Sequence, residues 1–133
     1  MQFAEAFKSL GYELKSPRQD WSAQKEDGVC ISLWQVEIEN AVSQRAFDSK
    51  VDAGPLELWA TKPGNVKRKI HFEICKAQFD GWLDVVIVTG TPGQAYKSAN
   101  PWKVAERHNH KWRLVHFENQ TGHFKVELQG RQT

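Results

Sequence analysis

The first ten residues repeat apolar side chains at the spacing of an amphipathic helix. The i, i+3, i+4, i+7 pattern is followed by Phe3, Ala6, Phe7 and Leu10. Gly11 then suits the position after the helix, because glycine adopts the left-handed conformation common there without strain. The pattern predicts a helix over residues 2–10 that buries one stripe.

A second, longer helix is predicted over residues 65–79, where Asn65 follows Pro63 and Gly64 and suits the N-cap. The residues that the same periodicity places on its buried arc are Val66, Ile70, Ile74 and Ala77, widened by Phe72, Cys75 and Phe79. The residues expected to face water are Lys67, Arg68, Lys69, Glu73 and Lys76. We expect Asp80-Gly81 to end this helix.

Apolar and β-branched runs bounded by turn residues indicate strands. Asp27-Gly28 is a preferred tight-turn pair, so a β-hairpin is predicted around it. Both alternating faces of the following run, VCISLW at residues 29–34, are apolar, which is typical of a central strand covered on both sides. The run WLDVVIVTGT, which starts at Trp82, predicts a second central strand.

The rest of the chain is less regular. Residues 36–56 fit either a helix or an exposed loop, and we expect a mobile surface excursion there. LELWA, residues 56–60, predicts a short strand or edge segment, and a loop is expected from Gly90 through Asn100. The last third predicts three strands, at residues 102–107, 112–118 and 123–128, joined by turns at Asn109-His110 and at residues 119–122.

The order of these elements predicts an α+β fold. We expect a largely antiparallel sheet packed with two helices, with a C-terminal three-stranded meander. A length of 133 residues fits one globular domain, residues 1–133, with a hydrophobic core of its own.

Four of the five histidines lie between residues 106 and 123, which raises the question of a metal site. The expected turn at residues 119–122 would pair Phe117 with Phe124 and Val115 with Val126. In this register, the side chains on one face of the meander are all apolar and are expected in the core: Trp102, Val104, Val115, Phe117, Phe124, Val126 and Leu128. The register scatters the histidines, whereas zinc needs about four ligands on one small tetrahedron. We therefore expect no metal and no cofactor.

The opposite face of the predicted meander would carry basic residues around an exposed aromatic ring. Its candidate binding residues are Lys103, Arg107, Trp112, His116 and Lys125. Cations neutralise phosphates and aromatic rings stack on bases, so this face predicts a binding module for nucleic acid. Two alternatives stay open: another part of the chain covers Trp112, or the face is the homodimer interface of an interaction protein without catalytic activity.

The charge distribution and the two cysteines bear on the kind of partner and on the cellular compartment. The net charge is only +2, but residues 1–60 carry 6 Lys and Arg against 10 Asp and Glu, whereas residues 61–133 carry 12 against 6. A basic second half points to an anionic partner. No apolar run approaches the roughly 18 residues of a membrane span. Cys30 and Cys75 form no CxxC motif, so we expect reduced, buried thiols in a cytoplasmic protein that makes no membrane contact.

Part of the chain, about residues 12–90, also resembles a family. The stretches WSAQKEDGVCISLWQVE, NVKRKIHFEICKA and WLDVVIVTG are similar to small uncharacterised bacterial proteins carried on mobile DNA and gene cassettes. Those proteins share a WS(W/A)…DG…LW..E hairpin followed by an R..H helix. The resemblance implies a DNA-related or defence-related role, and its candidate functional residues are Trp21, Trp34, Glu37, Arg68 and His71.

These five residues would line a cleft, which keeps an enzyme among the hypotheses. Arg68 and His71 are i, i+3 on one helix face, where they can jointly meet an anion or Glu37. No motif supports a particular chemistry: the histidine-rich stretch offers strands without the helix of an HNH centre, and TGTPGQ lacks the lysine of a phosphate-binding loop. An enzyme is therefore the less favoured hypothesis.

Overall fold

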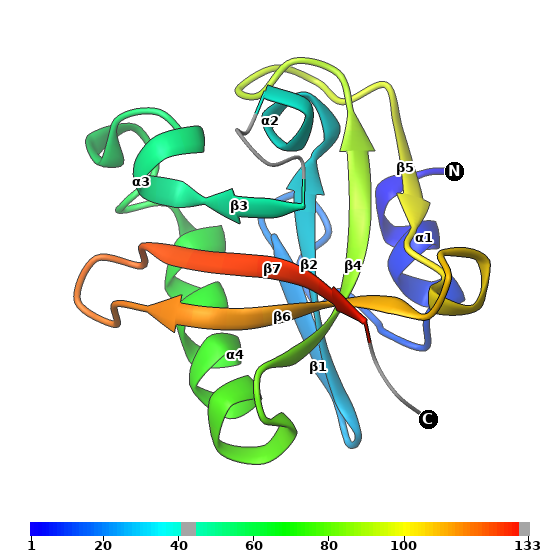
Figure 1. Ribbon diagram of the computed structural model, residues 1–133. Coiled ribbons are helices and arrows are strands. Elements are labelled where there is room, and N and C mark those ends of the chain that lie inside the picture. Colours follow the sequence, from blue (N-terminus) through cyan, green and yellow to red (C-terminus); the bar gives the residue numbers. More distant parts are fainter. Residues whose placement is uncertain (41–44, 131–133) are drawn as a thin grey trace.

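A bent sheet of seven strands organises the chain in its computed structural model, which describes residues 1–40 and 45–130 (Figure 1). The strands are β1 (Ser22–Lys25), β2 (Gly28–Trp34), β3 (Ala46–Asp48), β4 (Trp82–Thr89), β5 (Ser98–Pro101), β6 (His110–Phe117) and β7 (Phe124–Gly130). The helices are α1 (Phe3–Ser9), α2 (Gln35–Asn40), α3 (Ser49–Asp52) and α4 (Pro63–Phe79), with 3-10 turns η1 (Leu56–Leu58) and η2 (Val104–Glu106). The fold is α+β, as predicted.

The strand order is β1-β2-β4-β6-β7-β3, with β5 also on β4. Only β2 and β4 pair in parallel among the described strands. β4 joins two halves of the sheet, because Trp82 and Leu83 pair with β6 whereas residues 86–89 pair with β5. In Figure 1, β3, β6 and β7 consequently run across β2 and β4.

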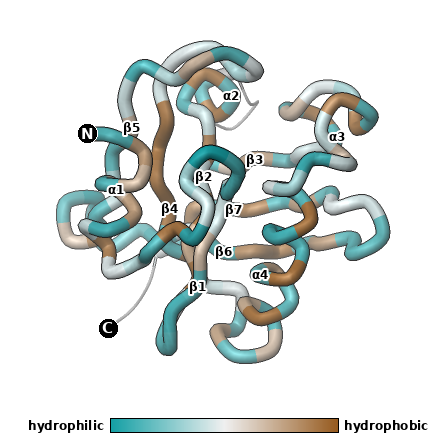
Figure 2. The backbone as a smooth tube through the Cα atoms, turned by 180° about the vertical axis from the view of Figure 1, so that it is seen from behind, coloured by the Kyte–Doolittle hydropathy of each residue, from teal (hydrophilic) through white to brown (hydrophobic). Residues whose placement is uncertain are grey.

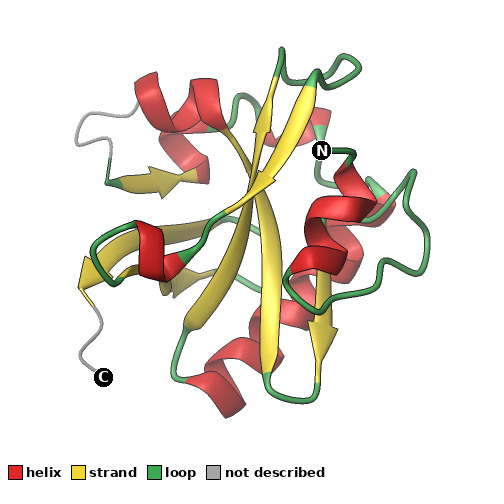
Figure 3. Ribbon diagram, turned by 90° about the vertical axis from the view of Figure 1, so that its right-hand side faces the viewer, coloured by secondary structure: helices red, strands yellow, loops and turns green. Residues whose placement is uncertain are grey.

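Two hydrophobic clusters lie on opposite faces of β2 and β4. Val29, Ile31 and Leu33 join the cluster that packs against Phe72 and Cys75 of α4. On the alternate positions of β2, Cys30 and Trp34 join the cluster that α1 covers. Figure 2 shows β4 as hydrophobic along most of its length, and Figure 3 shows helices around both sides of the strands. The prediction of central strands covered on both faces is confirmed, and both cysteines are free and buried.

The hairpin of β1 and β2 is also confirmed, with its turn displaced by one residue. Lys25 pairs with Gly28, so the turn consists of Glu26 and Asp27 rather than Asp27-Gly28. Gly28 is the first residue of β2, where a Cβ atom would lie 2.3 Å from the Tyr12 hydroxyl oxygen. The glycine therefore permits a close approach of Tyr12 and is not needed for the turn.

Three local predictions are wrong. In residues 36–56 the helix option holds at the start, where α2 lies, but the expected surface excursion contains β3, an edge strand that pairs with β7 and buries Phe47; residues 41–44 of that segment lie outside the described residues. LELWA contains η1 and no strand. Residues 102–107 contain η2 and no strand, whereas the preceding strand, β5, begins inside the expected loop and pairs with β4. Its partner strand decides the case of β5, since SANP has little intrinsic strand preference.

A β-bulge on β6 changes which side chains of the C-terminal hairpin face the core. Phe117 pairs with Phe124 as predicted, but Val126 pairs with Leu114, because the register shifts between Leu114 and His116. The bulge adds one residue to β6, so every side chain before it changes face. Val115, expected in the core, is exposed, whereas Leu114 and Trp112 are buried.

Only part of the predicted apolar arc of α4 is buried: Phe72 and Cys75 lie in the core as expected, whereas Val66 and Ile70 do not and Arg68, expected to face water, is buried. The buried residues of α4 are Gly64, Asn65, Arg68, Phe72 and Cys75. Val66 and Ile70 are 48% and 58% exposed. Phe72 and Cys75 anchor the C-terminal half, and the 3.6-residue period of a rigid helix then directs Arg68 and Asn65 inward. Asn65 is not the N-cap, because the helix begins at Pro63. In the described part of the chain, no helix is long and apolar enough to cross a bilayer.

Candidate functional site

The five residues of the predicted nucleic-acid surface do not form one surface. Trp112 is 1% exposed and packs edge-on against Trp102, with ring centroids 5.6 Å apart. Lys103 and Arg107 flank η2 near the start of β6, where the Arg107 guanidinium lies 4.3 Å from the Trp102 ring centre. His116 and Lys125 face each other across the strands at the other end of β6. The expectation of an exposed Trp112 is therefore wrong.

Acidic neighbours accompany the cations that remain on the outside of β6 and β7. Lys125 lies 3.7 Å from Glu127, and His116 lies 3.5 Å from Glu118. Lys50 also pairs with Glu118. Such exposed pairs stabilise a fold by roughly 0–1 kcal/mol. They also reduce the positive potential that a phosphate backbone would meet.

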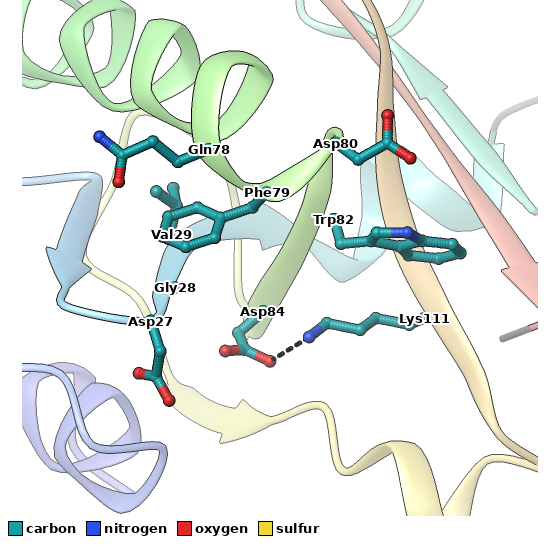
Figure 4. Close-up of a pocket in the computed structure, with 9 residues that line it drawn as sticks. All are labelled: Asp27, Gly28, Val29, Gln78, Phe79, Asp80, Trp82, Asp84 and Lys111. Atoms are coloured by element: carbon teal, nitrogen blue, oxygen red, sulfur yellow. Dashed lines mark ion pairs between the residues drawn. The ribbon is translucent and has the colours of Figure 1, made fainter. Parts of the chain in front are cut away.

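A polar pocket of about 330 Å³ opens where the β1–β2 turn meets the end of α4 and the strands β4 and β6 (Figure 4). Its lining residues are Asp27, Gly28, Val29, Gln78, Phe79, Asp80, Trp82, Asp84 and Lys111. Three of them are carboxylates. Figure 4 shows the Lys111 side chain reaching across from β6 toward Asp84.

Each carboxylate of this pocket has a cation beside it. Lys111 lies 3.3 Å from Asp84, Lys25 lies 3.7 Å from Asp27, and Arg113 lies 2.6 Å from Asp80. Asp84 also accepts a 2.6 Å hydrogen bond from the Tyr12 hydroxyl. Burial and the Asp84 carboxylate raise the pKa of Tyr12, so its hydroxyl stays protonated and keeps donating. The pocket's charges are thus compensated by the protein itself.

The residues of the predicted cleft divide between the two faces of the sheet. Trp21, which precedes β1, packs so closely on α4 that a Cβ atom at Gly64 would lie 2.3 Å from its ring. Its indole also lies 4.9 Å from the Arg68 guanidinium carbon. Trp34 joins the other cluster, under α1. Trp34 therefore lies apart from Trp21 and Arg68, as the alternation of side chains along β2 requires.

Arg68 projects from α4 into a group of aromatic rings. Its guanidinium carbon lies 4.6 Å from the ring centre of Phe124, 5.8 Å from that of Trp59 and 5.9 Å from that of Phe72, in addition to Trp21. These rings come from η1, α4, β7 and the segment before β1. Cation–π contacts of this kind contribute about 0.5–2 kcal/mol each when desolvated.

The guanidinium makes no ion pair within the described part of the chain. Arg68 is only 9% exposed, and its Nε makes no hydrogen bond. Two neighbouring polar atoms are also buried without a partner: Nε1 of Trp59 and Oδ1 of Asn65. Asn65 is one helical turn before Arg68 and uses its Nδ2 to donate to the carbonyls of Ala60 and Thr121. Buried polar atoms without partners are uncommon in native proteins.

Glu37 on α2 faces this group. Burial raises the pKa of Glu37 to about 7; the attraction of Arg68 opposes this rise and the repulsion of Asp52 adds to it. Burial also lowers the pKa of Arg68 to about 9, so the guanidinium remains charged at neutral pH. Glu37 is thus only partly ionised near pH 7 and leaves much of the Arg68 charge uncompensated.

His71, one turn after Arg68, forms a separate contact. Its Nδ1 lies 2.6 Å from Oγ of Ser22, and burial lowers the pKa of the imidazole. Ser22 is fully buried on β1, so this serine is not presented to a substrate as a nucleophile would be. A similar pair joins Ser49 to His123 at 2.9 Å.

We define the Arg68 cluster as Trp21, Glu37, Trp59, Asn65 and Arg68. The family pattern already indicated Trp21, Glu37 and Arg68. Trp59 and Asn65 gave no signal in the sequence, because Trp59 lies in an irregular segment and Asn65 suited a helix cap. Only the approach of η1 to the first turns of α4 brings them to Arg68.

Comparisons with known proteins do not identify a family for this chain. No family model, curated protein or solved structure matches this chain. Within residues 1–40 and 45–130, no group of three or more His, Cys, Asp and Glu side chains is arranged to hold a metal ion. The interpretation of function therefore rests on the charge and packing of the Arg68 cluster.

Proposed function

We propose that the protein is a binding module whose recognition site is the Arg68 cluster, and that its ligand carries a carboxylate or a phosphate. The observation that carries this proposal is the Arg68 guanidinium, nine-tenths buried and without an ion pair among the described residues. Taking a charge out of water costs several kcal/mol unless an opposite charge or good hydrogen bonds offset it. A bound anion would supply that compensation.

The neighbours of Arg68 suit such a ligand. A guanidinium offers paired donors that match the two oxygens of a carboxylate or phosphate. The unpartnered Nε1 of Trp59 is a further donor in the same cluster. Trp21 and Trp59 are half-buried, so their rings can cover a ligand while excluding water. The proposal assigns recognition to these residues and no catalytic step, which agrees with the buried position of Ser22.

Thermal unfolding in the presence of inorganic phosphate or acetate tests the proposal. A ligand at 100 times its dissociation constant stabilises the native state by about 2.7 kcal/mol. We expect either anion to raise the Tm of the wild-type chain at pH 7, and Arg68→Met to abolish the rise. Lys69→Met is the matched control, because it removes a cation from the outer side of the same helix. Equal Tm shifts in wild type and Arg68→Met, or no shift in wild type, would refute the proposal.

Nucleic-acid binding remains a second candidate, carried by the exposed Lys103 and Arg107 at η2, with Arg107 stacked on Trp102. If it holds, a mixed-sequence single-stranded oligonucleotide should bind at low salt and be released as salt rises. Changing both residues to Ala should remove this binding, whereas Arg68→Met should leave it intact. Binding that survives the double change would exclude η2 as the contact.

A further inference from the structure

The outer face of α4 presents an apolar row to solvent. Val66 and Ile70, one helical turn apart, are 48% and 58% exposed. They face away from the buried side of the helix, which packs on the sheet through Phe72 and Cys75. Figure 2 shows α4 in front of β6 and β7 when the molecule is seen from behind. In the described part of the chain, no element packs over this row.

Basic residues surround the row. Lys62 lies one turn before Val66, and Lys69, three residues after Val66, lies beside it on the helix surface. Lys76 continues the positive charge toward the C-terminal end, where its ammonium lies 5.9 Å from the Phe117 ring centre. None of these three lysines forms an ion pair with a described residue. Glu73, the one acid of α4, is exposed three residues after Ile70, so three lysines and one glutamate border the row. An apolar centre with a basic rim matches an acidic surface with an apolar centre.

We propose that this face of α4 is a docking surface for an acidic amphipathic helix of another protein. The partner's apolar side chains would pack on Val66 and Ile70, and its Glu or Asp side chains would meet Lys62, Lys69 and Lys76. A row of residues four apart is the ridge that a second helix packs against, at an axis distance of about 8–10 Å. This proposal is independent of the Arg68 cluster, which lies on the opposite face of the helix.

The charges disfavour the other occupants. A two-fold pairing of this face with a second copy would bring Lys69 close to Lys69 of that copy, and like charges in contact repel. Nucleic acid would meet the lysines and leave Val66 and Ile70 in water. A membrane surface is matched by a broad apolar face, whereas this row is one residue wide.

Fluorescence anisotropy with two designed helical peptides tests the docking surface. Both peptides carry Leu at i, i+3, i+4 and i+7; one has Glu and the other Lys at the flanking positions. We expect the Glu peptide to bind at least about tenfold more tightly than the Lys peptide, which corresponds to about 1.4 kcal/mol. Val66→Ser with Ile70→Ser should weaken its binding by a similar factor. Val51→Ser on α3 is the control, because Val51 is also exposed.

Each other outcome overturns the proposal. Equal affinity for the two peptides, or unchanged binding by the Val66→Ser, Ile70→Ser variant, would exclude an acidic helix at this face. Self-association in sedimentation equilibrium that the double variant abolishes would assign the face to a second copy. Binding to vesicles of anionic phospholipid that the double variant abolishes would assign it to a membrane surface. The Arg68→Met variant should bind the Glu peptide normally.

Discussion

The pocket around Asp84 and the Arg68 cluster are two polar regions that differ in how far neighbouring groups compensate their charges. In the pocket, Lys111 and the Tyr12 hydroxyl both contact the Asp84 carboxylate, and the other two carboxylates also have cations nearby. In the Arg68 cluster, the central cation is more deeply buried and lacks an ion pair among the described residues. The pocket forms a hollow of about 330 Å³, yet the cluster is the better candidate for recognition.

The difference suggests a criterion for choosing candidate sites: whether the protein itself already compensates the charge of a polar group. A polar group whose hydrogen-bond or ionic partners are already present stabilises the fold and gains nothing from binding a ligand. A buried charge without a partner lowers stability, and a ligand that supplies the partner recovers that stability on binding. Three predictions test this contrast.

Removing the charge of Asp84 should produce the largest loss of stability. Asp84→Asn keeps the size of the side chain but leaves Lys111, which is only 16% exposed, without its counter-ion. We expect the free energy of unfolding to fall by about 2 kcal/mol, because the partner of a partly buried pair is left unpaired. Urea denaturation measures this change.

Asp27→Asn is the matched control for that experiment. The Asp27 side chain is 84% exposed and its ion pair with Lys25 is long, so its loss should barely change stability. If Asp84→Asn is as harmless as Asp27→Asn, the pocket's charges are not compensated in the way that the contacts indicate.

Removing the charge of Arg68 should have the opposite sign. Arg68→Met keeps a long apolar side chain among the aromatic rings and removes a desolvated cation, so we expect stability to stay equal or rise by about 1 kcal/mol. The neighbouring change Lys67→Met should instead lower stability, because Lys67 lies 2.7 Å from the buried carboxylate of Asp20. A loss of more than about 2 kcal/mol in Arg68→Met would show that cation–π contacts make Arg68 a structural residue.

The third expected effect is a pH dependence that Glu37 introduces. Its pKa rises from 4.5 to about 7 on folding, chiefly through burial, with Arg68 and Asp52 as the charges that face it. Because the folded state binds this proton more tightly, the stabilisation is present below about pH 4.5 and is lost as the pH rises through 7.

Glu37→Gln removes this titration, so its Tm relative to wild type should increase between pH 5 and pH 8. Thermal unfolding of both proteins across that range measures the difference. If the Tm difference between the two proteins stays constant with pH, the pKa of Glu37 is ordinary. Glu37 is then ionised at neutral pH and compensates the charge of Arg68, which removes the contrast between the two regions.

The sequence anticipated part of the candidate site. Trp21, Glu37, Arg68 and His71 came from a family resemblance that no comparison tests, and three of them lie in the Arg68 cluster. The same resemblance also indicated Trp34, but the sheet separates Trp34 from Arg68. Trp59 could not be predicted, because a contact between η1 and α4 depends on the path of the intervening chain.

One single-residue event and one choice of helix face explain why other predictions were wrong. The bulge between Leu114 and His116 exchanges the faces of β6, and no sequence rule used above locates such an insertion. The rotation of α4 has a different origin. Its apolar arc is too broad to be buried as a whole, and periodicity alone does not say which edge, that of Val66 and Ile70 or that of Phe72 and Cys75, meets the core.

The sequence by itself determined the α+β class, the helix near the N-terminus, the first hairpin and the two central strands. These depend on local periodicity and on turn residues, which act between neighbours in the chain. The tertiary structure alone decided which face of α4 is buried, where β5 pairs and which side of β6 reaches the core. Those choices depend on packing between residues far apart in sequence, where burying Phe72 and Cys75 in the core carries Arg68 inward with them.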